Sequence, residues 1–175
     1  MSDVSHARHL IDTAERWLES SREALADRSA RDEYYSVAIT LELALKAWLS
    51  LHGYTDEQLR TSIGHDLGKA ATLTSALGLE LPAGIGRLLP AIHPFYMNGG
   101  FRRPDDRQWS REALCEAHLP LTEFYARIRA AVARAEVQQH LPPKGQHHDE
   151  RHEAPGAVIA AALRRAYRTV FRHRP

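Results

Sequence analysis

The chain has one cysteine, Cys115, among 175 residues. A single thiol can form neither an intrachain disulfide nor a zinc site built from several cysteines, which agrees with a reducing compartment. An excess of one charge sign is also absent, since 23 basic residues stand against 22 acidic ones and the formal net charge is +1. Bulk electrostatics therefore points to neither nucleic acid nor a membrane as a partner. We expect Cys115 in the core, because no basic neighbours mark it as a nucleophile.

Long apolar runs are missing as well. None approaches the roughly 18 to 20 residues that a membrane span requires. The opening stretch MSDVSHARHLIDTAERW carries charges where a secretory signal would need an apolar segment. The composition, 43% apolar and 26% charged, is ordinary for a soluble globular protein, and the length suits one domain. We therefore expect a cytoplasmic protein with no membrane partner.

Helical periodicity dominates the chain, and no alternating strand pattern is present. The spacing predicts helices over 3–26, 30–52, 66–77, 83–92 and 111–137, and a short helix that Thr55 caps. Prolines after 92 predict an irregular loop before the last of these helices. The fold class expected from this pattern is all-α: a helical bundle with an additional C-terminal helix.

The chain divides into three parts by composition. Residues 1–137 carry the bundle pattern, 138–155 form a polar linker rich in His and Pro, and 156–173 read as a basic amphipathic helix. His148 and His152 in the linker are spaced like a metal pair, but a solvated linker has no apolar shell to hold a metal. We assign no metal site.

The predicted helix over 30–52 is apolar on most of its faces. Such a helix is buried on several sides, either at the centre of a bundle or partly against another subunit. Its polar exceptions are Glu42 and Lys46, four residues apart in the favourable orientation for an ion pair. The excess of apolar surface is our reason to expect a homodimer.

Several motifs together resemble the HEPN superfamily. They are the E-x-x-x-K pair Glu42 and Lys46, the glycine after that helix, the GHDL element at 64–67, and FRRP at 101–104. The resemblance covers roughly 14–125 and implies an up-and-down bundle of four to five helices, usually dimeric. Many members are ribonuclease toxins with an R-x(4–6)-H motif that act without a metal or other cofactor. Others are binding or assembly modules, often paired with a small nucleotidyltransferase.

Two stretches match the R-x(4–6)-H pattern. Arg87 and His93 lie late in the bundle, as in catalytic members, although Pro90 interrupts the stretch between them. Arg60 and His65 are the alternative pair. In either pair, the His would act as general base on the ribose 2′-OH and the Arg would stabilise charge on the phosphate.

The GHDL element has two interpretations. Asp66 or His65 is placed to cap the helix that follows, and His65 can hydrogen-bond toward Glu42 or Lys46 on the buried helix. In the functional interpretation, Glu42, Lys46, His65 and Asp66 line a small pocket for a nucleotide or phosphate. We expect a HEPN-like binding or assembly domain of a toxin–antitoxin or defence-type system, associated with RNA or nucleotide and partnered by a nucleotidyltransferase or antitoxin. The alternative is a metal-independent endoribonuclease toxin.

Overall fold

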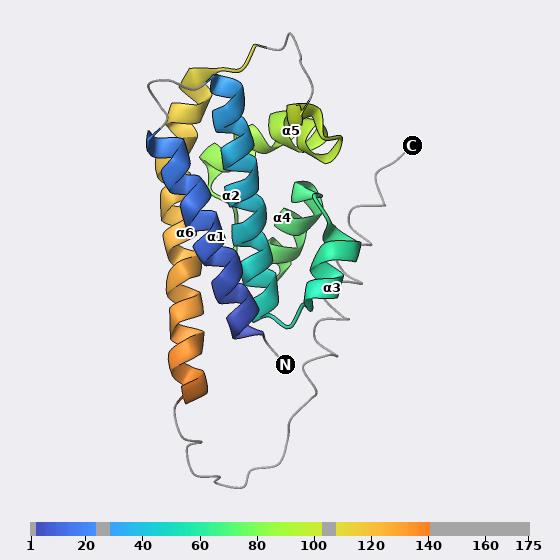
Figure 1. The fold of residues 1–175 in the computed structure, drawn as a ribbon, viewed down its shortest axis with the longest axis vertical. Coiled ribbons are helices and arrows are strands. Elements are labelled where there is room, and N and C mark those ends of the chain that lie inside the picture. The colour runs from blue at the N-terminus through green and yellow to red at the C-terminus, as the bar shows by residue number, and fades with distance from the viewer. Residues whose placement is uncertain (1–2, 24–28, 103–107, 141–175) are drawn as a thin grey trace, which may run out of the picture.

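A computed structural model describes residues 3–23, 29–102 and 108–140 (Figure 1). No strand occurs within these ranges, so the all-α prediction is confirmed. The elements are α1 (Val4–Glu23), α2 (Ala30–Leu51), α3 (Asp56–Gln58), the π-helical turn η1 (Leu59–Ile63), α4 (Leu67–Ala76), α5 (Ala83–Met97), the 3-10 turn η2 (Gly100–Arg102) and α6 (Arg111–His140).

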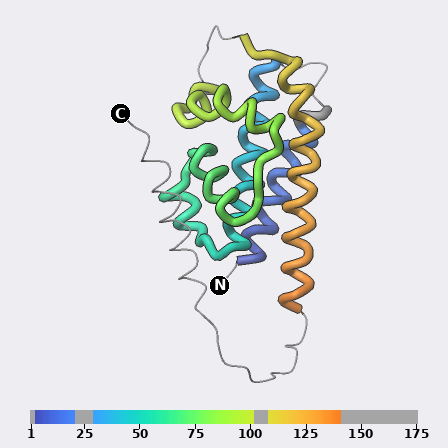
Figure 2. The backbone as a smooth tube through the Cα atoms, turned by 180° about the vertical axis from the view of Figure 1, so that it is seen from behind, coloured from blue at the N-terminus to red at the C-terminus, as the bar shows by residue number. Residues whose placement is uncertain are grey.

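The three long helices lie side by side along the length of the molecule. Figures 1 and 2 show α1 and α6 on one side of α2, and the shorter helices α3, α4 and α5 on the other. α1 and α2 run antiparallel, while α6 runs in the same direction as α2. α2 contacts α1, α4, α5 and α6, and is therefore the central element of the fold.

The burial of α2 matches its apolar sequence. Leu41, Leu45 and Leu49 are fully buried, and they repeat every four residues along the face toward the core. A second line of residues on α2, Tyr35, Ile39 and Leu43, is only half buried. α2 is thus buried on several sides by its own chain, as predicted, and keeps one partly exposed apolar stripe.

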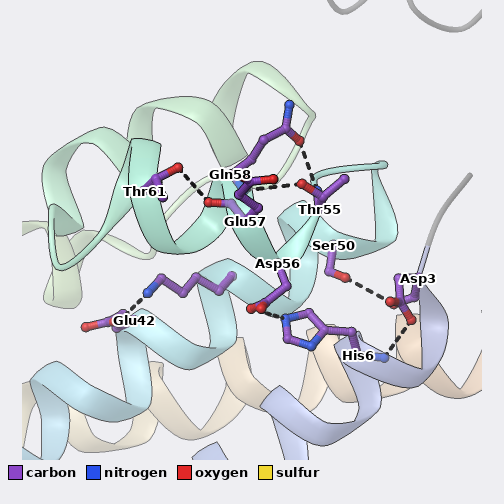
Figure 3. Close-up of polar contacts among 10 residues, drawn as sticks. Asp3, His6, Glu42, Ser50, Thr55, Asp56, Glu57, Gln58 and Thr61 are labelled. Carbon is purple, nitrogen blue, oxygen red and sulfur yellow. Dashed lines mark hydrogen bonds and ion pairs between the residues drawn. The ribbon is translucent and has the colours of Figure 1, made fainter.

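Local side-chain caps set the starts of α1, α2, α3 and α6. The Asp3 carboxylate accepts a hydrogen bond from the backbone N–H of His6, and the Ser29 side chain accepts one from Asp32 N–H. Thr55 and Gln58 form a reciprocal capping box, shown in Figure 3, as the short helix predicted from Thr55 requires. Ser110 Oγ accepts from Ala113 N–H at 3.2 Å and starts α6.

Two helices are longer than predicted. α5 continues through Pro90 and Pro94 to Met97, so the predicted end at residue 92 is wrong. The aromatic side chains beyond Pro94 pack closely; the Phe95 ring lies 4.8 Å from that of Phe101 and 5.1 Å from that of Trp109. α6 includes residues 138–140, which we expected in the linker.

Cys115 is exposed, so its predicted place in the core is wrong. α6 turns Leu114 and Ala117 inward, and Cys115 falls on the outer side of the same helix. Within the described ranges, no helix combines the length and apolar character needed to cross a membrane. The rest of the predicted linker, with His148 and His152, and the predicted helix over 156–173 lie outside the described residues.

Candidate functional site

A buried carboxylate joins three elements of the fold. Glu42 of α2 is only 8% exposed at its side chain. Its Oε1 accepts a hydrogen bond from Lys46 Nζ at 2.6 Å, and Figure 3 shows Glu42 in this contact. Its Oε2 accepts from the Tyr96 hydroxyl of α5 at 2.6 Å and contacts His65 Nδ1 at 2.9 Å. We call these four residues the Glu42 cluster.

His65 reaches Glu42 because of the turn that precedes α4. Leu59 and Ile63 are buried and anchor η1 to the core. Gly64 then adopts φ 56°, a left-handed conformation that glycine takes without steric cost, and the chain turns back toward α2. π-helical turns are frequent at functional sites, and this one positions both Arg60 and His65.

The charge state of Glu42 determines which nitrogen of His65 carries hydrogen. Burial by itself raises the pKa of the Glu42 carboxyl, but hydrogen bonds from His65, Lys46 and Tyr96 outweigh burial and leave the pKa below its usual value. The carboxylate is therefore ionised at neutral pH and can only accept hydrogen bonds. Nδ1 of His65 must donate, so the lone pair of the neutral ring is on Nε2. The His65 side chain is 66% exposed.

Two pockets meet at His65. The cationic pocket, about 200 Å³, is lined by Lys46, Arg60, His65 and His6, together with Asp56 and apolar residues of α1, α2 and η1. Asp56 Oδ1 lies 3.4 Å from His6 Nε2 (Figure 3), whereas Arg60 has no acidic partner among the described residues. The aromatic pocket, about 240 Å³, is lined by His65, Tyr35, Tyr96, Met97, Gly99 and Phe101.

Asp66 makes its contacts outside the Glu42 cluster. Its Oδ1 accepts a hydrogen bond from Lys69 N–H at 2.8 Å, which confirms the interpretation of Asp66 as the cap of α4. The same oxygen lies 3.6 Å from Nε2 of His93. Nδ1 of His93 accepts a longer hydrogen bond, 3.4 Å, from Gly68 N–H. The structure thus brings Glu42, Lys46 and His65 together and places Asp66 with His93.

The two Arg–His pairs are arranged differently. Arg87 is 68% exposed and its Nη2 lies 3.5 Å from a carboxylate oxygen of Glu116 on α6, while His93 faces the start of α4. Arg60 and His65 line the same pocket. The alternative pair therefore has the shared surface that joint action on one phosphate would require.

Tyr96 is the residue of the cluster that sequence reasoning missed. It lies beyond Pro94, in the segment expected to be an irregular loop, so no helical position was assigned to it. A helix predicted to continue past the prolines would have included Tyr96. Its spacing of three residues from His93 would then have made the two side chains neighbours on the surface of α5. Tyr35 and Phe101 of the aromatic pocket were likewise not expected at the site.

Comparison with known proteins finds no counterpart: no family model matches the chain, and no curated protein or solved structure matches it either. In the part of the chain that the structure describes, no three His, Cys, Asp or Glu side chains converge to hold a metal ion. The polar groups available for chemistry at this site are those of the Glu42 cluster and its two pockets.

Proposed function

We propose that this chain is a HEPN-like up-and-down bundle that binds a nucleotide unit, free or at an unpaired position of RNA, in the cationic and aromatic pockets. The observation that carries the proposal is the position of His65, which is held by Glu42 and lines both pockets. A ligand with an aromatic ring at one end and a phosphate at the other would span His65.

The cationic pocket supplies the phosphate contact. Arg60 has a planar guanidinium suited to phosphate oxygens, and no described acidic residue neutralises it. Lys46 lines the same pocket, but its charge is shared with Glu42 at 2.6 Å. We therefore assign the main phosphate contact to Arg60 and a supporting one to Lys46.

The aromatic pocket supplies the ring contact. Tyr35 and Phe101 lie with their ring centroids 5.5 Å apart, and Tyr96 lies 5.5 Å from the His65 ring. A nucleobase that stacks on such rings gains about 1–3 kcal/mol, with little dependence on sequence. The Tyr96 hydroxyl is bound to Glu42, so Tyr96 offers its ring and not its hydroxyl to a ligand.

The binding test uses adenosine monophosphate and a short single-stranded RNA, titrated calorimetrically. Arg60→Gln should weaken binding about tenfold to a hundredfold, as expected for loss of a charged hydrogen bond. Arg127→Gln, an exposed arginine on α6 with no described ion pair, is the matched control and should bind normally. Equal affinities of the two variants, or no binding by the unmodified protein, would reject the proposal.

We also propose that the chain forms a homodimer through the half-buried stripe of α2, with the two pockets, which Tyr35 and Leu43 help to line, at the edge of the interface. Tyr35, Ile39 and Leu43 are spaced four residues apart on one face of the central helix. Light scattering after size exclusion should give twice the chain mass, and Ile39→Glu should give a monomer. A nucleotidyltransferase or antitoxin as partner is proposed from the resemblance alone.

A second candidate function, metal-independent endoribonuclease, is favoured by one arrangement. With Nδ1 bound to Glu42, Nε2 of His65 can take the proton of a ribose 2′-OH, and Arg60 in the same pocket can stabilise charge on the phosphate. RNA cleavage in EDTA, lost in His65→Gln and retained in His93→Gln, would establish it. Loss in His93→Gln and Arg87→Gln only would assign the reaction to the other pair.

A further inference from the structure

We propose that His65 is a phosphoryl-acceptor site, modified at Nε2 to phosphohistidine by a reactive phosphoryl donor such as a phosphoramidate or an acyl phosphate. The inference deepens the proposed function and rests on one part of it, the entry of a phosphoryl group into the cationic pocket. It requires no turnover, because the product is a stoichiometric modification of the protein.

The first support is the nucleophile itself. Oε2 of Glu42, an ionised acceptor, holds the Nδ1–H of His65 at 2.9 Å and fixes the tautomer whose lone pair is on Nε2. A carboxylate bound to one ring nitrogen fixes the tautomer and the orientation of the ring. Histidine with an oriented lone pair is an established nucleophile in covalent catalysis. Because the ring is 66% exposed, a donor can approach it from solvent.

The second support comes from a comparison with other histidines of the chain. Nδ1 of His52 and of His140 each contacts a backbone carbonyl at 2.8 Å, so in neither ring does Nδ1 bind a carboxylate. His93 uses Nδ1 to accept a hydrogen bond from Gly68 N–H, which leaves Nε2 protonated and facing Asp66. Among these four, His65 alone combines a carboxylate on Nδ1 with a place in the lining of the cationic pocket.

The third support is the charge around the incoming group. Arg60 and Lys46 line the pocket next to His65 and can hold the oxygens of the transferred phosphoryl group. Glu42 remains bound to Nδ1 and stabilises the positive charge that the ring acquires. The site therefore places positive charge near the phosphoryl oxygens and negative charge near the imidazolium ring.

The phosphoryl transfer needs no reactant besides His65 and the phosphoryl donor. The Nε2 lone pair attacks phosphorus of phosphoramidate, which carries a protonated nitrogen at neutral pH. The new N–P bond forms as the P–N bond to the leaving group breaks, and ammonia leaves with the electron pair of that bond. The ring keeps its Nδ1 proton on Glu42 and carries the phosphoryl group on Nε2. With an acyl phosphate, a carboxylate leaves instead.

The modification has a consequence for ligand binding. A phosphoryl group on His65 brings negative charge to the boundary of the two pockets, where Arg60 would otherwise meet the ligand phosphate. Like charges at one small site repel, so the modified protein should bind adenosine monophosphate at least about tenfold more weakly. Phosphorylation of His65 would thus switch the binding module off.

The experiment treats the full chain with phosphoramidate and follows one added phosphoryl mass by intact-protein mass spectrometry. Phosphorus NMR identifies the nitrogen, and peptide mapping under alkaline conditions identifies the residue. His140 is an internal control, because it is exposed and has its Nδ1 on a carbonyl oxygen. We expect His65 to react at least about tenfold faster than His140. A tenfold difference in rate is about what one additional hydrogen bond to a charged group would provide.

Two variants separate nucleophile activation from folding. Glu42→Gln should slow the reaction of His65 and leave that of His140 unchanged, and Arg60→Gln, on an exposed position, should do the same without disturbing the fold. Equal rates at His65 and His140, or phosphorylation at Nδ1, would overturn the proposal. If nucleotide binding persists in a protein that is not phosphorylated at His65, the modification fails while the proposed function stands.

Discussion

The imidazole of His65, at the turn before α4, is bound through Nδ1 to the buried carboxylate of Glu42 on α2, 2.9 Å away. This contact ties a surface turn to the central helix of the fold. Because Oε2 also accepts the Tyr96 hydroxyl, the same oxygen fixes α5. A ligand that moved His65 would therefore change the contacts of Glu42 on α2 and of Tyr96 on α5.

Removing the carboxylate should destabilise the fold. Glu42→Ala leaves the Lys46 ammonium, whose side chain is 12% exposed, without its partner. Breaking a buried pair from one side costs about 3–5 kcal/mol, and the partial exposure of Lys46 places the expected loss at about 3 kcal/mol. Urea unfolding measures it. The control is Glu116→Ala, which breaks the exposed pair with Arg87 and should change stability by less than about 1 kcal/mol.

The stability of the fold should depend on pH through Glu42. The pKa of this carboxyl in the folded chain is below its ordinary value of 4.5, so folding favours the ionised form. The resulting stability is fully present above pH 4.5 and is lost as the pH falls through the lower pKa of the folded state. Glu42→Gln has no such titration, so the stability difference between the two proteins should shrink in acid. A difference that is constant from pH 7 to 3 would contradict the assignment.

Much of the polar cluster could be predicted because its physical requirements are local. A Glu and a Lys four residues apart on an otherwise apolar helix must satisfy each other, and the His after Gly64 is the nearest additional donor. Asp66 as a helix cap is likewise a local pattern. These expectations agree with the contacts of Lys46 and His65 to Glu42, and with the bond from Lys69 N–H to Asp66.

Tyr96 and the aromatic pocket could not be predicted because they depend on long-range packing. A proline inside an isolated helix costs about 3 kcal/mol, which predicted the end of α5 near residue 92. In the folded chain, Ile92 is buried and Phe95 packs on Phe101 and Trp109, so tertiary contacts outweigh that local cost. Arg60 and His65 line one pocket because of the π-helical turn η1. No local sequence pattern predicts such a turn.

The Tyr96 hydroxyl should contribute more than an ordinary tyrosine hydroxyl. It donates to an ionised carboxylate at 2.6 Å, whereas Tyr34 donates to the neutral backbone carbonyl of Ser110 at 3.1 Å. Hydrogen bonds to charged groups are worth about 1.5–3 kcal/mol and neutral ones about 0.5–1.5 kcal/mol. Tyr96→Phe should therefore lower the free energy of unfolding more than Tyr34→Phe does, with both rings kept in place. If chemical denaturation shows the same loss of unfolding free energy in both variants, the charge of the carboxylate does not strengthen this hydrogen bond.

Asp66 should act through its cap and not through the ligand. Its carboxylate accepts from Lys69 N–H and lies on the side of α4 that faces His93. Asp66→Ala should lower stability by about 1 kcal/mol, the usual cost of losing a helix cap, and Asp66→Ser should recover most of it because a serine hydroxyl also caps. Neither change should alter the affinity for adenosine monophosphate, since Asp66 is not part of the lining of the cationic or the aromatic pocket. Thermal unfolding and calorimetric titration of the same two variants separate the roles. A loss of affinity that Asp66→Ser does not restore would place Asp66 at the binding site instead, beside Glu42, Lys46 and His65.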